Sequence, residues 1–245
     1  MTRLVRPLLL LLVLLSSLAV SAADAPYLYR VTLVQASPGK LLELVDFYRS
    51  QSAALQAVGD ELPLWMRHSQ GDHWDLMLLW PMSNYSDYYA AERVSRRQAT
   101  LLSEKTISRM SELISWQEDL FCFGPPLGEL RKAFAAGGYF HVEMFQALPG
   151  QFRELYRERE MENAYSRALG QPQNFIFTRD QGAAWDLFTI GVFRDLKHYA
   201  SSSDASPEAQ QAAAKAAGFE SPAQIGPYLR RFIRSHHDTL AVAVK

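Results

Sequence analysis

The sequence has a single cysteine, Cys122, among its 245 residues, so no disulfide bond can form within one chain. Cysteine is among the residue types that are most often fully buried. Cys122 lies in an apolar run, Leu120-Phe121-Cys122-Phe123. In an oxidising compartment a lone thiol is best protected inside the protein. We therefore predict a small core residue rather than a reactive thiol.

An excess of charge of one sign is missing as well. The 25 basic and 26 acidic residues give a formal net charge of −1. Nucleic-acid-binding proteins normally carry a basic patch or stripe, so nucleic acid is not an expected partner. The chain also lacks a Gly-rich phosphate loop, a cysteine cluster for a metal and a nucleophile elbow. These absences argue against nucleotide-binding and hydrolase classes. A cofactor-independent oxygenase, which needs only a shaped pocket and a few polar groups, stays open.

The N-terminus has the pattern of a secretory signal peptide. Arg3 and Arg6 precede an apolar run from Leu8 to Val20, and small residues follow at positions 21–23. This order of charge, apolar run and small residues predicts cleavage after Ala22 or Ala23. An uncleaved N-terminal anchor is the alternative. No second apolar run of spanning length follows. We expect a protein secreted across the inner membrane into the periplasm, with no membrane span after cleavage.

An internal repeat organises the rest of the chain. The segment from Val31 to Leu44 recurs from Val142 to Leu155, an offset of 111 residues that brings Gln35-Ala36 onto Gln146-Ala147 and Pro38-Gly39 onto Pro149-Gly150. The same offset aligns Trp74-Asp75-Leu76 with Trp185-Asp186-Leu187, and Tyr88 with Tyr199. Beyond Tyr88 the copies drift, and the last strand needs an offset near 120. Fixed self-similarity of this kind predicts two copies of one structural unit.

Each copy shows the same order of patterns. Alternating β-branched and apolar residues predict strands, and Ser37-Pro38-Gly39 predicts a helix start with Ser37 as N-cap. In the first copy the expected elements are a strand over 29–35, a helix to Val58, a hairpin of strands over 64–68 and 74–80, a helix over 85–113 and a strand over 117–123. The second copy adds a short helix over 207–217 and resumes its second helix over 225–234. The order β-α-β-β-α-β is that of the ferredoxin-like unit. We divide the chain into a signal peptide (1–23), a first unit (24–123), a linker (124–138) and a second unit (139–245).

The segment from Trp74 to Tyr89, with its counterpart from Trp185 to Tyr199, resembles the dimeric α/β-barrel superfamily. The resemblance implies an α+β fold in which two ferredoxin-like units pack sheet to sheet as a pseudo-dimeric barrel. Members of that superfamily include antibiotic-biosynthesis-type monooxygenases, haem-degrading enzymes, chlorite-dismutase-like haem proteins and isomerases, so the fold does not settle the function. The resemblance implies a small-molecule enzyme, oxygenase-like in type. The alternative is a non-catalytic periplasmic module for ligand binding or assembly.

The candidate site lies where the copies differ. The offset aligns Arg30 with His141 and Thr32 with Glu143, and His237 belongs to a last strand expected to lie beside the first strand of its copy. We therefore predict a catalytic cluster of His141, Glu143 and His237 in the space between the two sheets. Imidazole and carboxylate groups could bind a divalent metal or act as general acid and base. Polar residues at a sheet edge, solvated or hydrogen-bonded, are the alternative.

Further residues are candidates for ligand binding. These are Arg30, Thr32, Trp65, Asp75 and Asp186. Because Asp75 and Asp186 occur in both copies, a hydrogen-bonded structural role is the favoured alternative for them, and Trp65 could equally belong to the core. The sequence names no cofactor. The expected partners are a small-molecule ligand and a second copy of the chain.

Overall fold

The computed structural model describes residues 26–201 and 204–244, so the predicted signal peptide lies outside the described residues. None of the helices in these ranges is both long enough and apolar enough to cross a membrane. The first half begins with strand β1 (Tyr27–Ala36), in which Leu28, Tyr29, Val31 and Val34 are all 0% exposed. Residues on both sides of the strand are buried, because one face is covered by helices and the other by the second half.

The described part of the first half follows the predicted order, with its helical segments divided into short pieces. After β1 come α1 (Leu41–Ser50), α2 (Ser52–Ala57), β2 (Leu64–Gln70), β3 (Leu76–Ser83), α3 (Tyr85–Tyr88), α4 (Ala91–Leu101), α5 (Glu104–Leu113) and β4 (Ile114–Gly124). The linker forms α6 (Leu127–Ala136). The second half comprises β5 (Tyr139–Ala147), α7 (Phe152–Ala168), β6 (Phe175–Gly182), β7 (Leu187–Phe193), α8 (Leu196–Ala200), α9 (Pro207–Ala217), the 3₁₀ turn η2 (Pro222–Gln224), α10 (Ile225–Leu229) and β8 (Ile233–Ala243).

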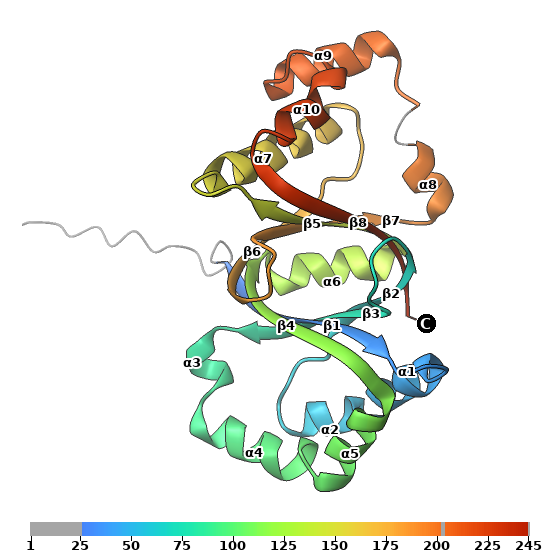
Figure 1. Cartoon of the computed structure of the whole chain (residues 1–245), viewed down its shortest axis with the longest axis vertical. Helices are drawn as coiled ribbons and strands as arrows, with labels where there is room; N and C mark the ends of the chain where they lie inside the picture. The colour runs from blue at the N-terminus through green and yellow to red at the C-terminus, as the bar shows by residue number, and fades with distance from the viewer. Residues whose placement is uncertain (1–25, 202–203, 245) are drawn as a thin grey trace, which may run out of the picture.

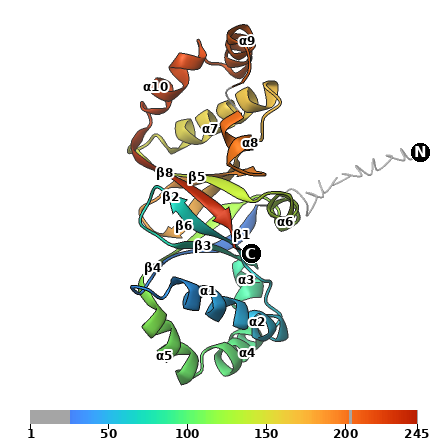
Figure 2. The ribbon, with the colours of Figure 1, turned by 90° about the vertical axis from the view of Figure 1, so that its right-hand side faces the viewer.

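The strands close into one antiparallel barrel in the order β1-β3-β2-β8-β5-β7-β6-β4. Within each half the last strand lies beside the first, β4 beside β1 and β8 beside β5, as predicted. The β2–β8 and β4–β6 pairs join the two halves. Figures 1 and 2 show the barrel in the middle of the molecule, with the helices of each half at opposite ends. The predicted fold class, two ferredoxin-like units packed sheet to sheet, is confirmed.

The barrel interior is a packed apolar core. Its strand residues include Tyr29, Val31, Phe140 and Val142, and the linker helix α6 adds Leu130, which is 0% exposed. Cys122 belongs to the same core, is a free thiol and is fully buried, as predicted. Burial raises the pKa of this thiol well above its usual range. Apolar side chains thus fill most of the space between the two sheets.

Two local predictions need correction. Helix α1 begins at Leu41 rather than Pro38, and Ser37 does not cap it. Instead the Ser37 carbonyl accepts a hydrogen bond from Lys40 N (2.8 Å) in a turn that places Gly39 at φ +77°. The helix predicted over 225–234 ends at Leu229, because β8 already pairs with β5 at Ile233. The last strand is therefore longer, and the helix before it shorter, than the pattern predicted.

The barrel seam depends on glycine at one position of each half. Gly182 has φ +79°, and a Cβ there would lie 2.5 Å from the Asp119 carbonyl oxygen across the β4–β6 pair. A Cβ at Gly71, in the first half, would likewise clash with the Asp238 carbonyl oxygen of β8. We expect Gly182→Ala to lower the free energy of unfolding by roughly 2–4 kcal/mol, since it adds left-handed strain to a backbone clash. Urea denaturation measures this, with Gly150→Ala as the control, because that glycine has the same φ sign (+77°) but nothing within 4 Å. Equal losses in the two variants would contradict the explanation by close approach.

Candidate active site on the helix-covered face of the second half

His141 and Glu143 lie on the face of β5 that is covered by helix α7, so their predicted position between the two sheets is wrong. Glu143 contacts Arg159 of α7, whereas its strand neighbours Val142 and Met144 pack in the barrel core. The reason is the alternation of the strand: once the apolar set fills the barrel, the polar set must face the helices. His141 and Glu143 share one face of β5, as predicted, but this is the face toward the helices and not the face toward the second sheet.

His237 does not join them. It lies on the opposite face of β8, with its ring 4.9 Å from that of Trp185 and its Nδ1 3.3 Å from Asp72 Oδ2. Its neighbour Asp238 takes the predicted place, because Asp238 is directly opposite Glu143 in the β5–β8 register. Asp238 Oδ1 is 3.6 Å from His141 Nε2. An alignment of Asp238 with Asp119, which pairs with Thr32 in the first half, is the sequence signal that could have identified it.

A buried ion-pair cluster on α7 completes the site. Arg159, whose side chain is 2% exposed, contacts Glu158 at 2.6 Å, Glu162 at 2.5 Å and Glu143 at 3.5 Å. Glu158 is 0% exposed. One guanidinium thus faces three carboxylates in a space with little access to water. Burying so many charges costs free energy, and arrangements of this kind are concentrated at functional sites. The sequence prediction missed these residues. Their only signal is helical spacing, since Leu155, Arg159 and Glu162 recur on one side of α7.

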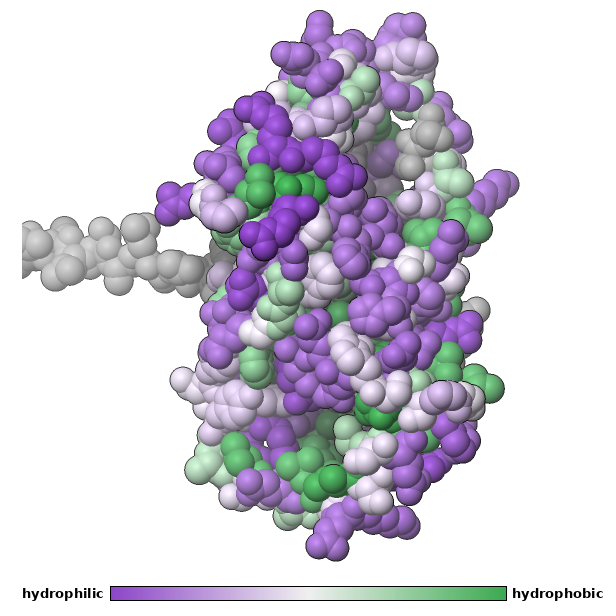
Figure 3. Space-filling model, in the orientation of Figure 1, coloured by the Kyte–Doolittle hydropathy of each residue, from purple (hydrophilic) through white to green (hydrophobic). Residues whose placement is uncertain are grey.

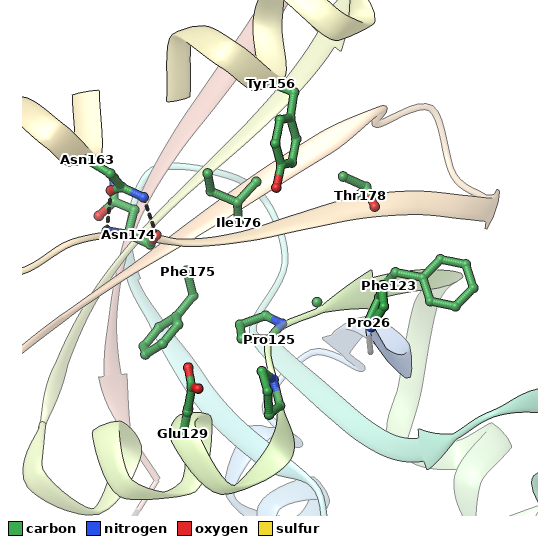
Figure 4. A pocket seen from close by; sticks show the side chains of 12 residues that line it. Pro26, Phe123, Pro125, Glu129, Tyr156, Asn163, Asn174, Phe175, Ile176 and Thr178 are labelled. Atoms are coloured by element: carbon green, nitrogen blue, oxygen red, sulfur yellow. Dashed lines mark hydrogen bonds between the residues drawn. The ribbon is translucent and has the colours of Figure 1, made fainter. Parts of the chain in front are cut away.

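The Glu143 carboxylate is held in place from three sides. Besides Arg159, Thr189 Oγ1 donates to it at 3.0 Å and Asn174 Nδ2 at 3.3 Å. Asn174 is fixed in turn by a pair of hydrogen bonds with Asn163, of 2.7 and 2.8 Å, drawn as dashed lines in Figure 4. Both asparagines border an open groove of about 610 Å³ between β6 and the start of α6. The cluster therefore lies next to a surface groove of substrate size.

Several pKa values in the cluster are displaced in a direction that suits proton transfer. Burial, reinforced by Glu143 and Glu158 against the opposing effect of Arg159, raises the pKa of Glu162 to about 7. Burial opposes the charged form of His141, but Asp238 and Glu143 outweigh it and raise the pKa of this imidazole. Glu162 therefore gains and loses a proton near neutral pH, where a general acid or base works best.

These shifts predict how the metal-free protein responds to pH. Glu162 and His141 both have raised pKa values in the folded state, so the stability they confer is present at acid pH and is lost as the pH rises. For Glu162 the loss spans the interval from its ordinary value near 4.5 to about 7. We expect the free energy of unfolding to fall between pH 5 and pH 8, as measured by urea denaturation in EDTA. The Glu162→Gln variant should show a flatter profile, and an equally steep one would contradict the assignment.

The corresponding face of the first half holds a cavity, and an ion pair between Asp60 and Arg97 is part of its lining. Arg30 and Thr32 line a space of about 260 Å³ beneath α4 and α5, together with Tyr48, Trp80 and Gln117. Figure 3 shows the surface hollowed over this half, at the lower end of the molecule. Arg30 and Thr32 therefore adjoin a cavity, although it is not the predicted one between the sheets. Thr32 stands where Glu143 stands in the second half, so no carboxylate extends into this cavity from that position.

The remaining candidates have structural contacts. Asp75 accepts a hydrogen bond from the Ala36 backbone N–H at 2.8 Å, and Asp186 accepts the matching bond from Ala147 at 2.9 Å. Both aspartates connect the start of a hairpin strand to the end of the first strand of the same half. This is the hydrogen-bonded structural role that was the favoured alternative to ligand binding. Trp65 packs against the ring of Tyr48 at 6.2 Å, within the helix-side core of the first half.

Comparisons with known proteins identify the fold and not a family. No protein-family model and no curated protein matches the sequence. Among solved structures, an anthrone oxidase-like protein matches with a TM-score of 0.55 at 13% identity, over 91% of this chain and 93% of the other. A provisionally named monooxygenase from Lactobacillus acidophilus matches at 0.52 and 7% identity, over 89% and 94% of the two chains. This chain has the dimeric α/β-barrel fold. A provisionally named chlorite dismutase has the same fold, at a TM-score of 0.50, 12% identity and 90% and 96% coverage.

Some proteins with the dimeric α/β-barrel fold bind haem, and the residues of this chain do not fit it. A porphyrin needs apolar walls and an imidazole free to bind iron. Between β5 and α7 in the second half lie the charged side chains of Arg159, Glu158 and Glu162, and His141 lies against Asp238. In the first half the matching position is Arg30, which cannot act as an axial ligand.

Proposed function

We propose that this chain is an exported small-molecule enzyme of the dimeric α/β-barrel type, oxygenase-like, with its site on the helix-covered face of the second half. The observation that carries the proposal is the buried set of Arg159 and three glutamates adjoining His141 and Asp238. Buried ionisable groups with displaced pKa values beside a groove are typical of catalytic sites. The solved structures described as a monooxygenase and as anthrone oxidase-like support this class of reaction.

The cluster suits proton removal from an activated aromatic substrate. In this scheme a C–H or O–H group of an anthrone or phenol gives its proton to the Glu162 carboxylate. The electron-rich anion that results passes one electron to O₂, and recombination of the two radicals forms a C–O bond in a peroxide anion. The peroxide takes the proton back from Glu162, and at a carbon that still carries hydrogen the loss of water then leaves a carbonyl group. Arg159 holds Glu162 in place at 2.5 Å and stabilises negative charge. Glu162 and His141 keep 30% and 19% of their side-chain surface exposed, so both remain within reach of a bound molecule.

Oxygen consumption tests the proposal. The mature chain is incubated with a panel of anthrones, naphthols and hydroquinones, and O₂ uptake is followed with an electrode while products are identified by mass spectrometry. We expect protein-dependent uptake with a subset of the panel and incorporation of ¹⁸O from ¹⁸O₂. Uptake that is no faster than in protein-free buffer, across the whole panel, would count against an oxygenase.

Export is tested separately. N-terminal sequencing of protein from the native periplasm should begin at Ala23 or Asp24, which is where cleavage after Ala22 or Ala23 leaves the chain. A chain that still begins at Met1 would show that the apolar run is retained.

A ligand-binding module is the second candidate function, and the first-half cavity favours it. The space of about 260 Å³ is lined by aromatic rings and by Arg30, whose Nε is buried without a hydrogen-bond partner among the described residues. Native mass spectrometry of protein purified from its own periplasm tests this function. A bound molecule that is lost in a Trp80→Ala variant, in a protein without oxygen-consuming activity, would favour the module over the enzyme.

A further inference from the structure

The faces of β5 and β8 that point toward α7 bring three metal-binding side chains together. His141 and Glu143 are two residues apart on β5, and Asp238 lies opposite Glu143 on β8. One donor atom from each lies within 4.8 Å of the other two. Strand β5 is paired on both sides, with β8 and with β7, so the backbone that carries two of the donors is rigid. A rigid support of this kind keeps the donors in place without a loop that must first become ordered.

Charge in this region favours a further cation. Glu143, Glu158, Glu162 and Asp238 are four carboxylates, and Arg159 is the buried guanidinium among them. Glu158 Oε1 is buried with no hydrogen-bond partner in the part of the chain that the structure describes. Glu158 binds Arg159 through its other oxygen, and buried carboxylates are unfavourable unless positive charge lies near them. A divalent ion bound beside Glu143 would add positive charge to this group of carboxylates.

The donor set selects the kind of ion. One imidazole nitrogen and two carboxylates suit Mn²⁺, Fe²⁺ or Zn²⁺, whereas Ca²⁺ and Mg²⁺ prefer oxygen ligands alone. Ligands around such an ion lie roughly 3 Å apart, since metal–ligand bonds are about 2.0–2.2 Å long. The Asp238 side chain is 52% exposed, so rotation of this residue can close the remaining distance. Thr189 and Asn174 already orient Glu143, as outer partners of metal ligands commonly do.

The first half lacks the same set. Its matching positions are Arg30, Thr32 and Asp119, where Thr32 donates to Asp119 at 2.5 Å and Arg30 Nε is 3.9 Å from the same carboxylate. A guanidinium has no lone pair to offer a metal. The first half therefore has its positive charge built in as Arg30, at the position where the second half has His141. This comparison predicts one ion for each chain rather than two.

From this geometry we infer that His141, Glu143 and Asp238 bind one divalent transition-metal ion, of the Mn²⁺, Fe²⁺ or Zn²⁺ class. The site goes beyond the proposed enzyme and does not depend on it, because binding can be measured without turnover. His236 Nε2, 3.1 Å from Asp238 Oδ2, orients the carboxylate from the other side.

Metal titration of the tag-free mature chain tests the inference. After EDTA treatment and dialysis, Mn²⁺ and Zn²⁺ are titrated by calorimetry, and Co²⁺ is followed by its visible d–d absorption. We expect one ion per chain with a Kd in the micromolar range or tighter, and a Tm that rises with metal concentration. Less than one tenth of an ion bound per chain at 1 mM metal would overturn the proposal.

Variants locate the ion. Asp238→Asn should weaken binding at least tenfold, and His141→Arg, which copies the first half, should abolish it. His237→Ala is the matched control, since this imidazole lies one residue from Asp238 on the other face of the strand and should leave the affinity unchanged. Each variant is first checked for a cooperative thermal transition. Binding that survives both ligand substitutions, or that is lost in His237→Ala alone, would place the ion elsewhere and refute the assignment.

Metal binding and turnover are separable outcomes. Oxygen uptake that persists in EDTA while the metal titration shows one ion would support both the enzyme and the metal site as independent properties. Uptake without any metal binding would refute the metal site and leave the enzyme standing. Metal binding without oxygen uptake would refute the enzyme and leave the metal site standing.

Discussion

Replacing Glu162 with glutamine should lower kcat about 10²–10⁴-fold, the range over which a general acid or base contributes. The glutamine amide has nearly the same shape as the carboxylate but cannot accept a proton from the substrate. Burial and the neighbouring Glu143 and Glu158 raise the pKa of Glu162 to about 7, so in the wild-type protein this group gains and loses a proton near neutral pH. The measurement is kcat as a function of pH on the substrate identified by oxygen consumption.

The control for this variant lies two residues away. Glu160 is exposed on the outer side of α7, and Glu160→Gln removes the same charge from the same helix without touching the cluster. We expect Glu160→Gln to keep full activity and the wild-type pH profile. The base assignment fails if Glu162→Gln retains more than about a tenth of kcat, or if its pH profile keeps the wild-type ascending limb.

Replacing Arg159 with methionine should destabilise the fold by roughly 3–5 kcal/mol at pH 8, the usual cost of removing one partner of a buried ion pair. Glu158 is 0% exposed and would then be a buried carboxylate without a counter-charge. For a chain of this length the loss corresponds to a Tm lowered by about 6–20 °C. Phe145 would also lose the guanidinium that lies 4.8 Å above its ring.

The pH dependence of Tm distinguishes the loss of the Arg159 counter-charge from the loss of packing. Protonation of Glu158 and Glu162 removes the uncompensated charge, so the deficit of Arg159→Met should shrink markedly between pH 8 and pH 5, whereas a packing defect would not respond to pH. Arg157→Met is the control, because Arg157 is exposed on the same helix and its loss should change Tm little. A Tm deficit of equal size at both pH values would show that the charge is not the cause.

Sequence patterns predicted the scaffold well, because strand alternation and the 111-residue offset are local or periodic signals. They placed β1 and β5, the β2–β3 hairpin, the helix over 207–217 and the position of β4 beside β1. They also gave His141 and Glu143 a common face and marked them as the positions at which the two halves differ. Predictions that depended on a single residue fared less well, as with Ser37, whose carbonyl closes a turn instead of capping a helix.

Strand alternation in the sequence puts His141 and Glu143 on one side of a strand, but the packing of the whole fold fixes which side that is. Strand periodicity defines two faces and cannot tell which one meets helices and which one meets a second sheet. Only the closure of the barrel, which buries Val142 with Val31 in one apolar core, assigns the polar face to α7. The same closure sets the β5–β8 register, which places Asp238 and not His237 beside Glu143 on the face toward α7. It also brings Arg159 and Glu162 against the sheet. Helical spacing puts these two residues on one side of α7 but does not show what that side contacts.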